Sequence, residues 1–204
     1  MAELRTDTNV TTNLGVRSPT NTEKIWKLLR RAEALDQQYL QWDNSLPHSW
    51  KPKTVSWVDL PEADIYGSAI YPGRVDAYEH LRIAYIHNFT RSCRLFIWNT
   101  ILRFIAWLSE PRDYRLSLEY TTASRISRYI VNDVVASVPF FFGWSRDAYP
   151  AIFGKSQFAC GDETSIKSLS GTTVMWPLPT AMFSDFATKA QQAFLRKKLE
   201  YCLV

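Results

Sequence analysis

The stretch TNTEKIWKLLRRAEALDQQYLQWDNSL, residues 20–46, carries the clearest periodic signal in the sequence. Its large apolar side chains recur every three or four residues, as they do along one face of an α-helix. The stripe consists of Ile25, Leu28, Ala32, Leu35, Tyr39, Trp42 and Leu46. We predict a helix here that begins at a capping box formed by Thr20 and Glu23 and ends before Pro47, which cannot continue a helix.

This apolar stripe has two interpretations. It can pack against the core of its own chain, or it can form the seam of a coiled-coil dimer with a protein partner. Its length of about three heptads is near the minimum for a coiled coil, so packing against the core is favoured. The candidates for a partner seam are Ile25, Leu28, Leu35, Tyr39 and Trp42.

The rest of the sequence also favours helices. Apolar residues on two faces predict a long central helix over about 74–108, ended by Pro111. A third helix is predicted over about 115–137, with Val138-Pro139 as its end, and a last one over about 184–203. Glycine is scarce, and no alternating strand pattern lasts beyond four residues.

These elements define the predicted architecture. Residues 1–19, rich in Thr and Asn, are expected to be a disordered tail, and residues 20–204 a helical domain. Residues 47–74 form a proline-containing connector, in which one helical turn is expected near Pro61, and residues 145–171 a polar surface loop. The fold class is therefore all-α: a bundle of about five to seven helices around a long central helix, with proline-rich connectors.

Charge and cysteine content exclude several classes of protein. The net charge of +4 arises from 24 basic and 20 acidic residues, which is too mild a bias to indicate nucleic-acid binding. Three cysteines, far apart, form neither a disulfide scaffold nor a zinc site and suit a reducing compartment. No apolar leader or membrane span is visible, so a nuclear or cytoplasmic location is expected.

No catalytic motif emerges from the sequence. It contains no Gly-rich phosphate loop, no GxSxG elbow and no HExxH motif. His80 and His87 are seven residues apart, about 10 Å along a helix axis, too far to bind one metal ion. Asp76 and His80 are four apart and are expected to form a hydrogen-bonded pair on a helix face. We expect no metal, no cofactor and no enzymatic activity.

Polar side chains on the predicted central helix are the best site candidates. Asn88, Arg91 and Arg94 recur every three residues, and a buried guanidinium requires a partner such as Asp133 on the third helix. These residues form either a polar network in the core or, together with Tyr85 and His87, an anion or ligand pocket. The sequence leaves both alternatives open.

Four phrases resemble one known family. The run YLQWDNSLPHSWKP (Tyr39–Pro52) resembles the opening of the fungal-specific transcription factor domain. HLRIAYIHNFTRSCRL (His80–Leu95) is similar to its central helix, where an Ala is followed by Asn-x-x-Arg-x-x-Arg. DVVASVPFFFG (Asp133–Gly143) and MWPL (Met175–Leu178) resemble its Ser-Val-Pro-Phe and Trp-Pro-Leu segments. Their order and spacing match the family across about residues 25–200.

This resemblance implies a regulatory role. In that family a six-cysteine zinc cluster usually precedes the helical domain, and the domain regulates activity through ligands, partners or self-association. The sequence lacks the cluster and ends inside a helix that the family continues. We therefore expect a non-enzymatic, transcription-regulator-like domain without its own DNA-binding module, acting through a protein partner or a small apolar ligand. The alternative is a stand-alone small-molecule-binding protein or cofactor-free enzyme from a biosynthetic gene cluster, with Tyr85, His87 and Arg91 orienting the ligand.

Overall fold

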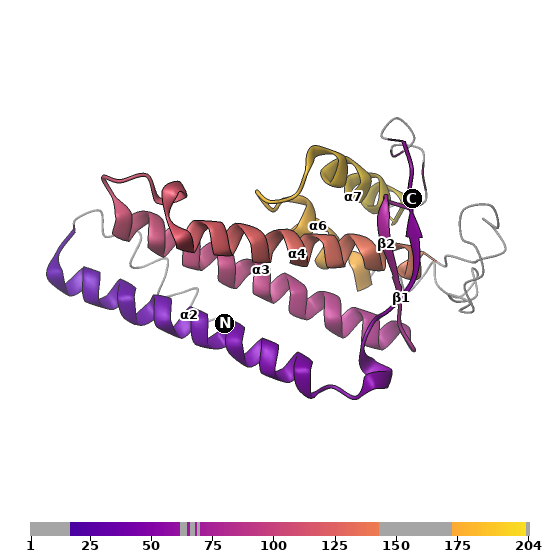
Figure 1. Cartoon of the computed structure of the whole chain (residues 1–204), viewed down its shortest axis with the longest axis horizontal. Helices are drawn as coiled ribbons and strands as arrows, with labels where there is room; N and C mark the ends of the chain where they lie inside the picture. Colours follow the sequence, from indigo (N-terminus) through magenta and orange to yellow (C-terminus); the bar gives the residue numbers. More distant parts are fainter. Residues whose placement is uncertain (1–16, 62–64, 66–67, 69, 143–172, 203–204) are drawn as a thin grey trace. The chain divides into compact units, whose positions relative to one another are not determined.

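The computed structural model describes residues 17–61, 65, 68, 70–142 and 173–202. The chain divides into two compact units. Unit 1 combines the residues up to Ser45 with Cys93–Ser127, and unit 2 combines Leu46–Ser92 with the residues from Arg128 onward. The helices α3 (Leu81–Ser109) and α4 (Leu118–Phe141) are each continuous and contribute residues to both units (Figure 1).

Unit 1 begins with the helix α2 (Pro19–Ser45), which confirms the helix predicted from the apolar stripe. Its N-terminus differs from the prediction, because the cap is Ser18 and not Thr20. The Ser18 hydroxyl accepts a hydrogen bond from the Asn21 amide at 3.1 Å, and Pro19 occupies the first helical position, where no N–H is needed. The helix ends before Pro47 as predicted.

The core of unit 1 lies between α2 and the Cys93–Ser109 part of α3. Helix α2 contributes Ile25, Leu28, Leu29 and Ala32, and α3 contributes Ile97, Ile101, Phe104 and Ile105. Leu35, Tyr39, Trp98, Trp107, Leu108 and Tyr114 pack against this cluster while remaining partly exposed. Within unit 1, the N-terminal part of the apolar stripe, Ile25, Leu28 and Ala32, is therefore buried against α3.

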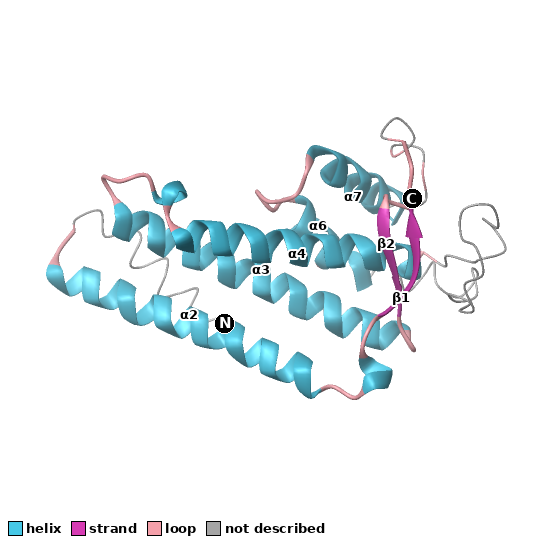
Figure 2. Cartoon of the chain, viewed as in Figure 1, coloured by secondary structure: helices cyan, strands magenta, loops and turns pink. Residues whose placement is uncertain are grey.

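Unit 2 contains a small antiparallel sheet that the sequence analysis did not predict. Strand β1 (Lys53–Val58), inside the predicted connector, pairs with β2 (Gly73–Ala77), which runs from the end of that connector into the predicted central helix (Figure 2). The register shifts between Thr54 and Ser56, and this bulge breaks the two-residue alternation by which a strand is recognised. The molecule is thus mostly helical with a two-stranded sheet, and the prediction of a purely all-α bundle is corrected.

The sheet also corrects the start of the central helix. Residues 74–77, predicted as its first turn, belong to β2, and α3 begins at Leu81. A short 3₁₀ helix, η1 (His48–Trp50), precedes β1 in unit 2, and another, η3 (Tyr114–Leu116), lies between α3 and α4 in unit 1. Pro111 lies two residues beyond α3, as predicted.

The end of α4 lies beyond the predicted boundary. The helix passes through Pro139 and stops at Phe141. A proline in the last turn removes only one backbone hydrogen bond, and the burial of Phe140 and Phe141 offsets that loss. A long apolar segment can therefore carry a helix past a proline.

Among its described residues, unit 2 also contains α6 (Pro177–Met182) and α7 (Lys189–Cys202), which contact each other. The last helix begins five residues later than predicted because of a capping box. The Thr188 hydroxyl accepts from the Gln191 amide at 3.1 Å, and the Gln191 side chain accepts from the Thr188 amide at 2.9 Å. Most of the tail predicted over residues 1–19, and the loop over 145–171, lie outside the described residues.

Candidate functional site

The buried guanidinium of Arg91 forms the centre of a polar network in unit 2. Arg91 on α3 donates to the Tyr78 hydroxyl at 2.7 Å and to the Asn88 side-chain carbonyl at 2.8 Å. Asn88 in turn donates to the Ser137 hydroxyl of α4 at 2.8 Å, and Ser137 donates to the Val134 carbonyl at 2.7 Å. The network thus connects the residue after β2 with α3 and α4.

A charged part of the same network lies nearer the solvent. Asp133 on α4 contacts both Arg74 of β2, through a hydrogen bond from Nη2, and Arg91, whose Nε lies 3.8 Å from Oδ2. Arg74 Nη2 also lies 2.9 Å from Oδ2 of the buried Asp76, although without hydrogen-bond geometry. Thr54 of β1 donates to the other oxygen of Asp76 at 2.9 Å. Two arginines therefore face two aspartates, so the buried charges are balanced.

The electrostatics agree with a permanently charged cluster. Burial opposes the charge on Arg91, but Tyr78, Asp133 and Asp76 favour it, and together they raise the pKa of Arg91 above its ordinary value. Burial raises the pKa of Tyr78, and Arg91 offsets this only in part. Tyr78 is therefore neutral and Arg91 positive at physiological pH. Neither group is poised to exchange a proton with a substrate.

The remaining unit 2 candidates, His87 and Tyr85, have contacts of their own. His87 is buried, its Nε2 lies 2.9 Å from the Trp50 carbonyl oxygen, and its ring centroid is 5.7 Å from that of Tyr78. Tyr85 is 37% exposed, and its ring lies 6.2 Å from that of Phe89. Of the six predicted polar candidates, the structure brings together Asn88, Arg91 and Asp133.

Arg94 belongs to a separate ion pair in unit 1. Its Nε and Nη2 donate to the two carboxylate oxygens of Asp36 on α2, at 2.7 and 3.2 Å. Asp36 is 1% exposed, so this two-pronged contact is a buried salt bridge. Asp36 was not predicted, although a signal existed. It follows Ala32 by four residues and therefore lies on the apolar face of the helix, where a charge requires a partner.

The partner-seam candidates are largely occupied within unit 1. Ile25 and Leu28 are buried in the core cluster, and Leu35 and Tyr39 pack against it. Trp42 remains half-buried. Burial raises the pKa of Tyr39 to about 12, and Cys93 adds to that effect. The faces of Ile25 and Leu28 are therefore not available as an open dimer seam.

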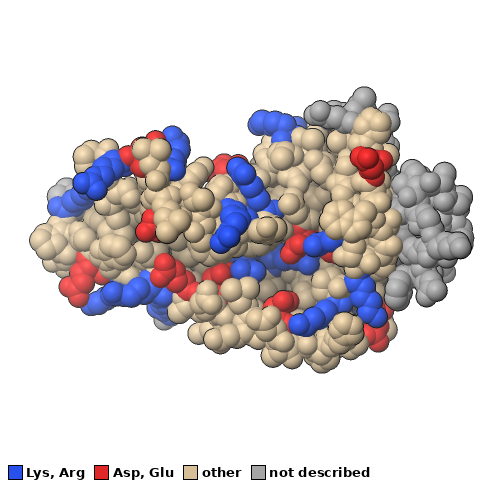
Figure 3. Space-filling model, viewed as in Figure 1, with Lys and Arg blue, Asp and Glu red and all other residues tan. Residues whose placement is uncertain are grey.

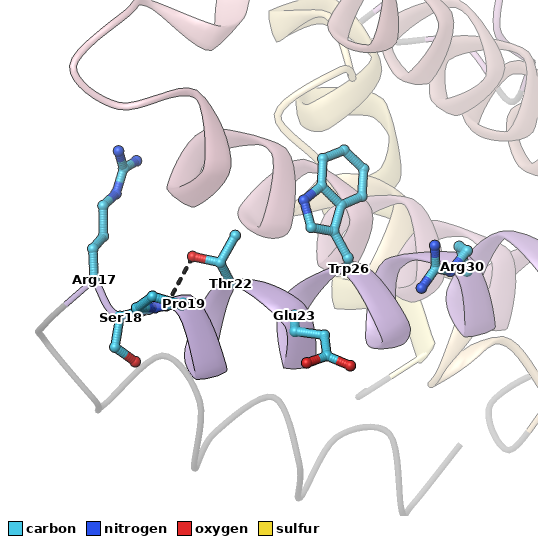
Figure 4. Close-up of a pocket in the computed structure, with 7 residues that line it drawn as sticks. All are labelled: Arg17, Ser18, Pro19, Thr22, Glu23, Trp26 and Arg30. Carbon is cyan, nitrogen blue, oxygen red and sulfur yellow. Dashed lines mark hydrogen bonds between the residues drawn. The ribbon is translucent and has the colours of Figure 1, made fainter.

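A shallow pocket of about 760 Å³ lies at the start of α2. It is lined by Arg17, Ser18, Pro19, Thr22, Glu23, Trp26 and Arg30. The side chains of Glu23 and Trp26 point to opposite sides of the helix (Figure 4), and Arg17 already donates to the backbone carbonyls of Trp107 and Glu110. The lining residues do not converge on one point, so this pocket is a weak candidate for a ligand site.

Other features bear on metals, membranes and nucleic acids. Within the part of the chain that the structure describes, no three His, Cys, Asp or Glu side chains are close enough to hold a metal ion. No helix in the described ranges has the length and apolarity needed to cross a membrane. On the face drawn in Figure 3, basic and acidic side chains are interspersed. The expected helix-face pair of Asp76 and His80 is wrong, because Asp76 lies in β2 and bonds to Thr54.

Four members of the network, Arg74, Asp76, Tyr78 and Ser137, were not predicted from the sequence. The first three belong to or follow β2, so an incorrect helix assignment hid their proximity to α3. Ser137 was visible as one of the residues in line along the third helix, but a serine there carries no signal of a partner.

Comparison with known proteins gives one distant relative. Over 180 residues, 88% of this chain, the sequence is 24% identical to the transcription factor dbaG of Emericella nidulans. The chain spans 41% of the length of that protein. No family model matches the sequence, and no solved structure matches it. The chain is thus related, at a distance, to a fungal transcription factor.

Proposed function

We propose that the chain is a non-enzymatic, transcription-regulator-like helical domain that acts through a protein partner or a small ligand in the nucleus. The observation that carries this proposal is the similarity to transcription factor dbaG over 88% of the chain. The contacts of Arg91 support a structural role for the network, because its Nη1 donates to Tyr78 and Asn88 and its Nε lies 3.8 Å from Asp133 within the same chain. Asn88, Arg91 and Asp133 would then hold the domain in shape and not bind a substrate.

We further propose that these 204 residues contain no DNA-binding module. The sequence has three cysteines, too few for a six-cysteine zinc cluster, and basic residues exceed acidic residues by only four. The purified chain should show no measurable affinity for duplex DNA at physiological salt. Submicromolar binding to any duplex in a gel-shift assay would contradict this part of the proposal.

The regulatory role is tested by tethering. The 204-residue chain, fused to an unrelated DNA-binding domain, should raise or lower transcription of a reporter gene in fungal nuclei. Arg91→Met, which breaks the buried network, should abolish the effect, whereas Arg103→Met, at an exposed position of α3, should preserve it. A stably expressed fusion that leaves the reporter unchanged would refute the proposal.

A further inference from the structure

The connection between α3 and α4 in unit 1 carries two unusually exposed leucines. Leu116 is 88% exposed and Leu118 is 77% exposed, and no other large apolar side chain among the described residues is as exposed as either. Leu116 is the last residue of η3, and Leu118 is the first residue of α4. Ser117 lies between them and is half-buried. The fold therefore presents this serine on a projecting part of the surface, between two apolar side chains that an enzyme could bind.

The conformation of Ser117 leaves its hydroxyl group able to react. Its Oγ accepts a hydrogen bond from the Tyr120 amide at 3.1 Å, and that bond does not use the O–H proton. Its backbone is extended, with φ of −83° and ψ of 156°, as in peptides that bind along a groove. Only two backbone bonds hold the turn before it, from the Leu116 amide to Asp113 and from the Ser117 amide to Tyr114. A turn with so few bonds opens easily.

Exposed arginines precede this serine. Arg112 and Arg115 lie five and two residues before Ser117, and both are exposed. The carboxylate of Asp113, between them, accepts a hydrogen bond from the Arg115 amide at 2.9 Å, and Glu119 follows Ser117. Both guanidinium groups therefore lie on the N-terminal side of the serine. An enzyme with acidic groups at the matching end of its groove would complement this pattern of charge.

A second serine with the same local sequence is inaccessible. In the whole sequence, only Ser117 and Ser127 have an arginine two residues before them, Arg115 and Arg125 respectively. Ser127 is 0% exposed and lies in the interior of α4, so its backbone is held in a helix. An enzyme that needs an accessible serine would therefore act on Ser117 and not on Ser127.

We propose that Ser117 is a phosphorylation site for an arginine-directed protein kinase that uses a nucleoside triphosphate. The hydroxyl oxygen attacks the γ-phosphorus, and an O–P bond forms. The bond from that phosphorus to the oxygen bridging the β- and γ-phosphates breaks, and the nucleoside diphosphate leaves. The hydroxyl proton passes to the kinase base and then to solvent, and no oxidant or reductant is required. The product places a charge of about −2 between the two leucines, at the N-terminus of α4, where a helix favours an anion.

The intact 204-residue chain tests the proposal. It is incubated with Mg²⁺, ATP and the catalytic subunit of cyclic-AMP-dependent protein kinase, an arginine-directed enzyme, and analysed by peptide mass spectrometry. Ser117 should be phosphorylated at least about tenfold faster than Ser127, because Ser127 becomes accessible only when α4 opens. In synthetic peptides of residues 110–121 and 120–131, the ratio of the two rates should fall toward one because the fold is absent.

Variants separate the site from nonspecific phosphorylation. Arg115→Ala should slow phosphorylation of Ser117 on the order of tenfold, the effect of losing one charge pair with the kinase. Arg103→Ala, at an exposed position of α3, is the matched control and should leave the rate unchanged. Ser117→Thr keeps both the hydroxyl and the cap of α4 and should still be phosphorylated, whereas Ser117→Ala should not.

Three results would overturn the proposal: no phosphate at Ser117, equal rates at Ser117 and Ser127 in the folded chain, or an unchanged rate in Arg115→Ala. The measured quantity is a modified peptide, so the outcome does not depend on the regulatory function proposed above.

Discussion

The buried salt bridge of unit 1 offers the sharpest test of the structure. Arg94→Met keeps a long apolar stem on α3 but removes the guanidinium that holds Asp36. Asp36 is 1% exposed, so the variant leaves a carboxylate without its two donors in an apolar region of α2. The loss of stability therefore arises from Asp36, which stays charged and buried in the variant.

The size of the effect follows from the burial of Asp36 and the partial burial of Arg94. Removing one partner of a buried pair costs about 3–5 kcal/mol, because the remaining charge stays desolvated. The Arg94 side chain is 18% exposed, and water that reaches the cavity will solvate Asp36 in part, so we expect about 3 kcal/mol. For a chain of this length, that lowers the melting temperature by about 6–12 °C.

A double variant separates this cost from the loss of packing. Asp36→Leu combined with Arg94→Met replaces both charges with apolar groups, and such replacements of a whole buried pair are often neutral or stabilising. The double variant should therefore recover most of the stability lost in Arg94→Met. The difference between the single and double variants measures the coupling between the two side chains.

The assay is urea unfolding followed by far-UV circular dichroism and by tryptophan fluorescence. Coincident transitions would justify a single free energy of unfolding for a chain with two compact units. The matched control is Arg103→Met, an exposed arginine on the same helix, which should change stability by less than about 0.5 kcal/mol. A loss below 1 kcal/mol for Arg94→Met would refute the pairing with Asp36.

Three other perturbations have defined outcomes. Burial lowers the pKa of Lys198 to about 8 in the folded chain, whereas the unfolded chain has an ordinary lysine pKa, so the unfolded state binds more protons between these two values. The free energy of unfolding should therefore rise with pH in this range. Lys198→Met should reduce that rise, measured as urea midpoints from pH 8 to 10 against wild type. Thr188→Ala removes the cap of α7 and should cost about 1 kcal/mol by thermal unfolding, whereas Thr188→Ser should cost little. Gly73 has φ of +117° and space for a methyl group, so Gly73→Ala should cost about 1–3 kcal/mol through backbone strain alone; an unchanged melting temperature would contradict that φ angle.

Helical periodicity explains how much of the fold was predictable. The stripe from Ile25 to Trp42 predicts α2 because each position falls on one side of a 3.6-residue turn, and burial of that side stabilises the helix. Its exact start was not predictable from the capping pattern alone. Ser18-Pro19 and Thr20-x-x-Glu23 both resemble helix starts, and the structure uses the first.

The sheet was not predictable for a different reason. β1 and β2 have six and five residues and are separated in sequence by residues 59–72, so their pairing is a non-local contact that no short window contains. Asp76 also makes β2 hard to recognise from its sequence, because a buried carboxylate is rare in a strand unless it has a hydrogen-bond donor. Here that donor is Thr54 of β1. The Arg91–Asp133 contact was predictable because a buried guanidinium requires a charged partner, and only a few acidic residues could be that partner.

Two arginines of α3, Arg91 and Arg94, suggest why charges persist in these cores. Arg91 pairs with Asp133 of α4 in unit 2, and Arg94 pairs with Asp36 of α2 in unit 1. Apolar contacts are non-directional and tolerate a shifted helix, whereas a displaced arginine leaves a desolvated charge. We therefore expect the Asp36→Leu, Arg94→Met chain to be nearly as stable as wild type but less uniquely packed, with broadened methyl resonances for the α2–α3 core residues Ile25 and Ile101. Equally sharp resonances would show that apolar packing alone fixes the position of α2 against this part of α3.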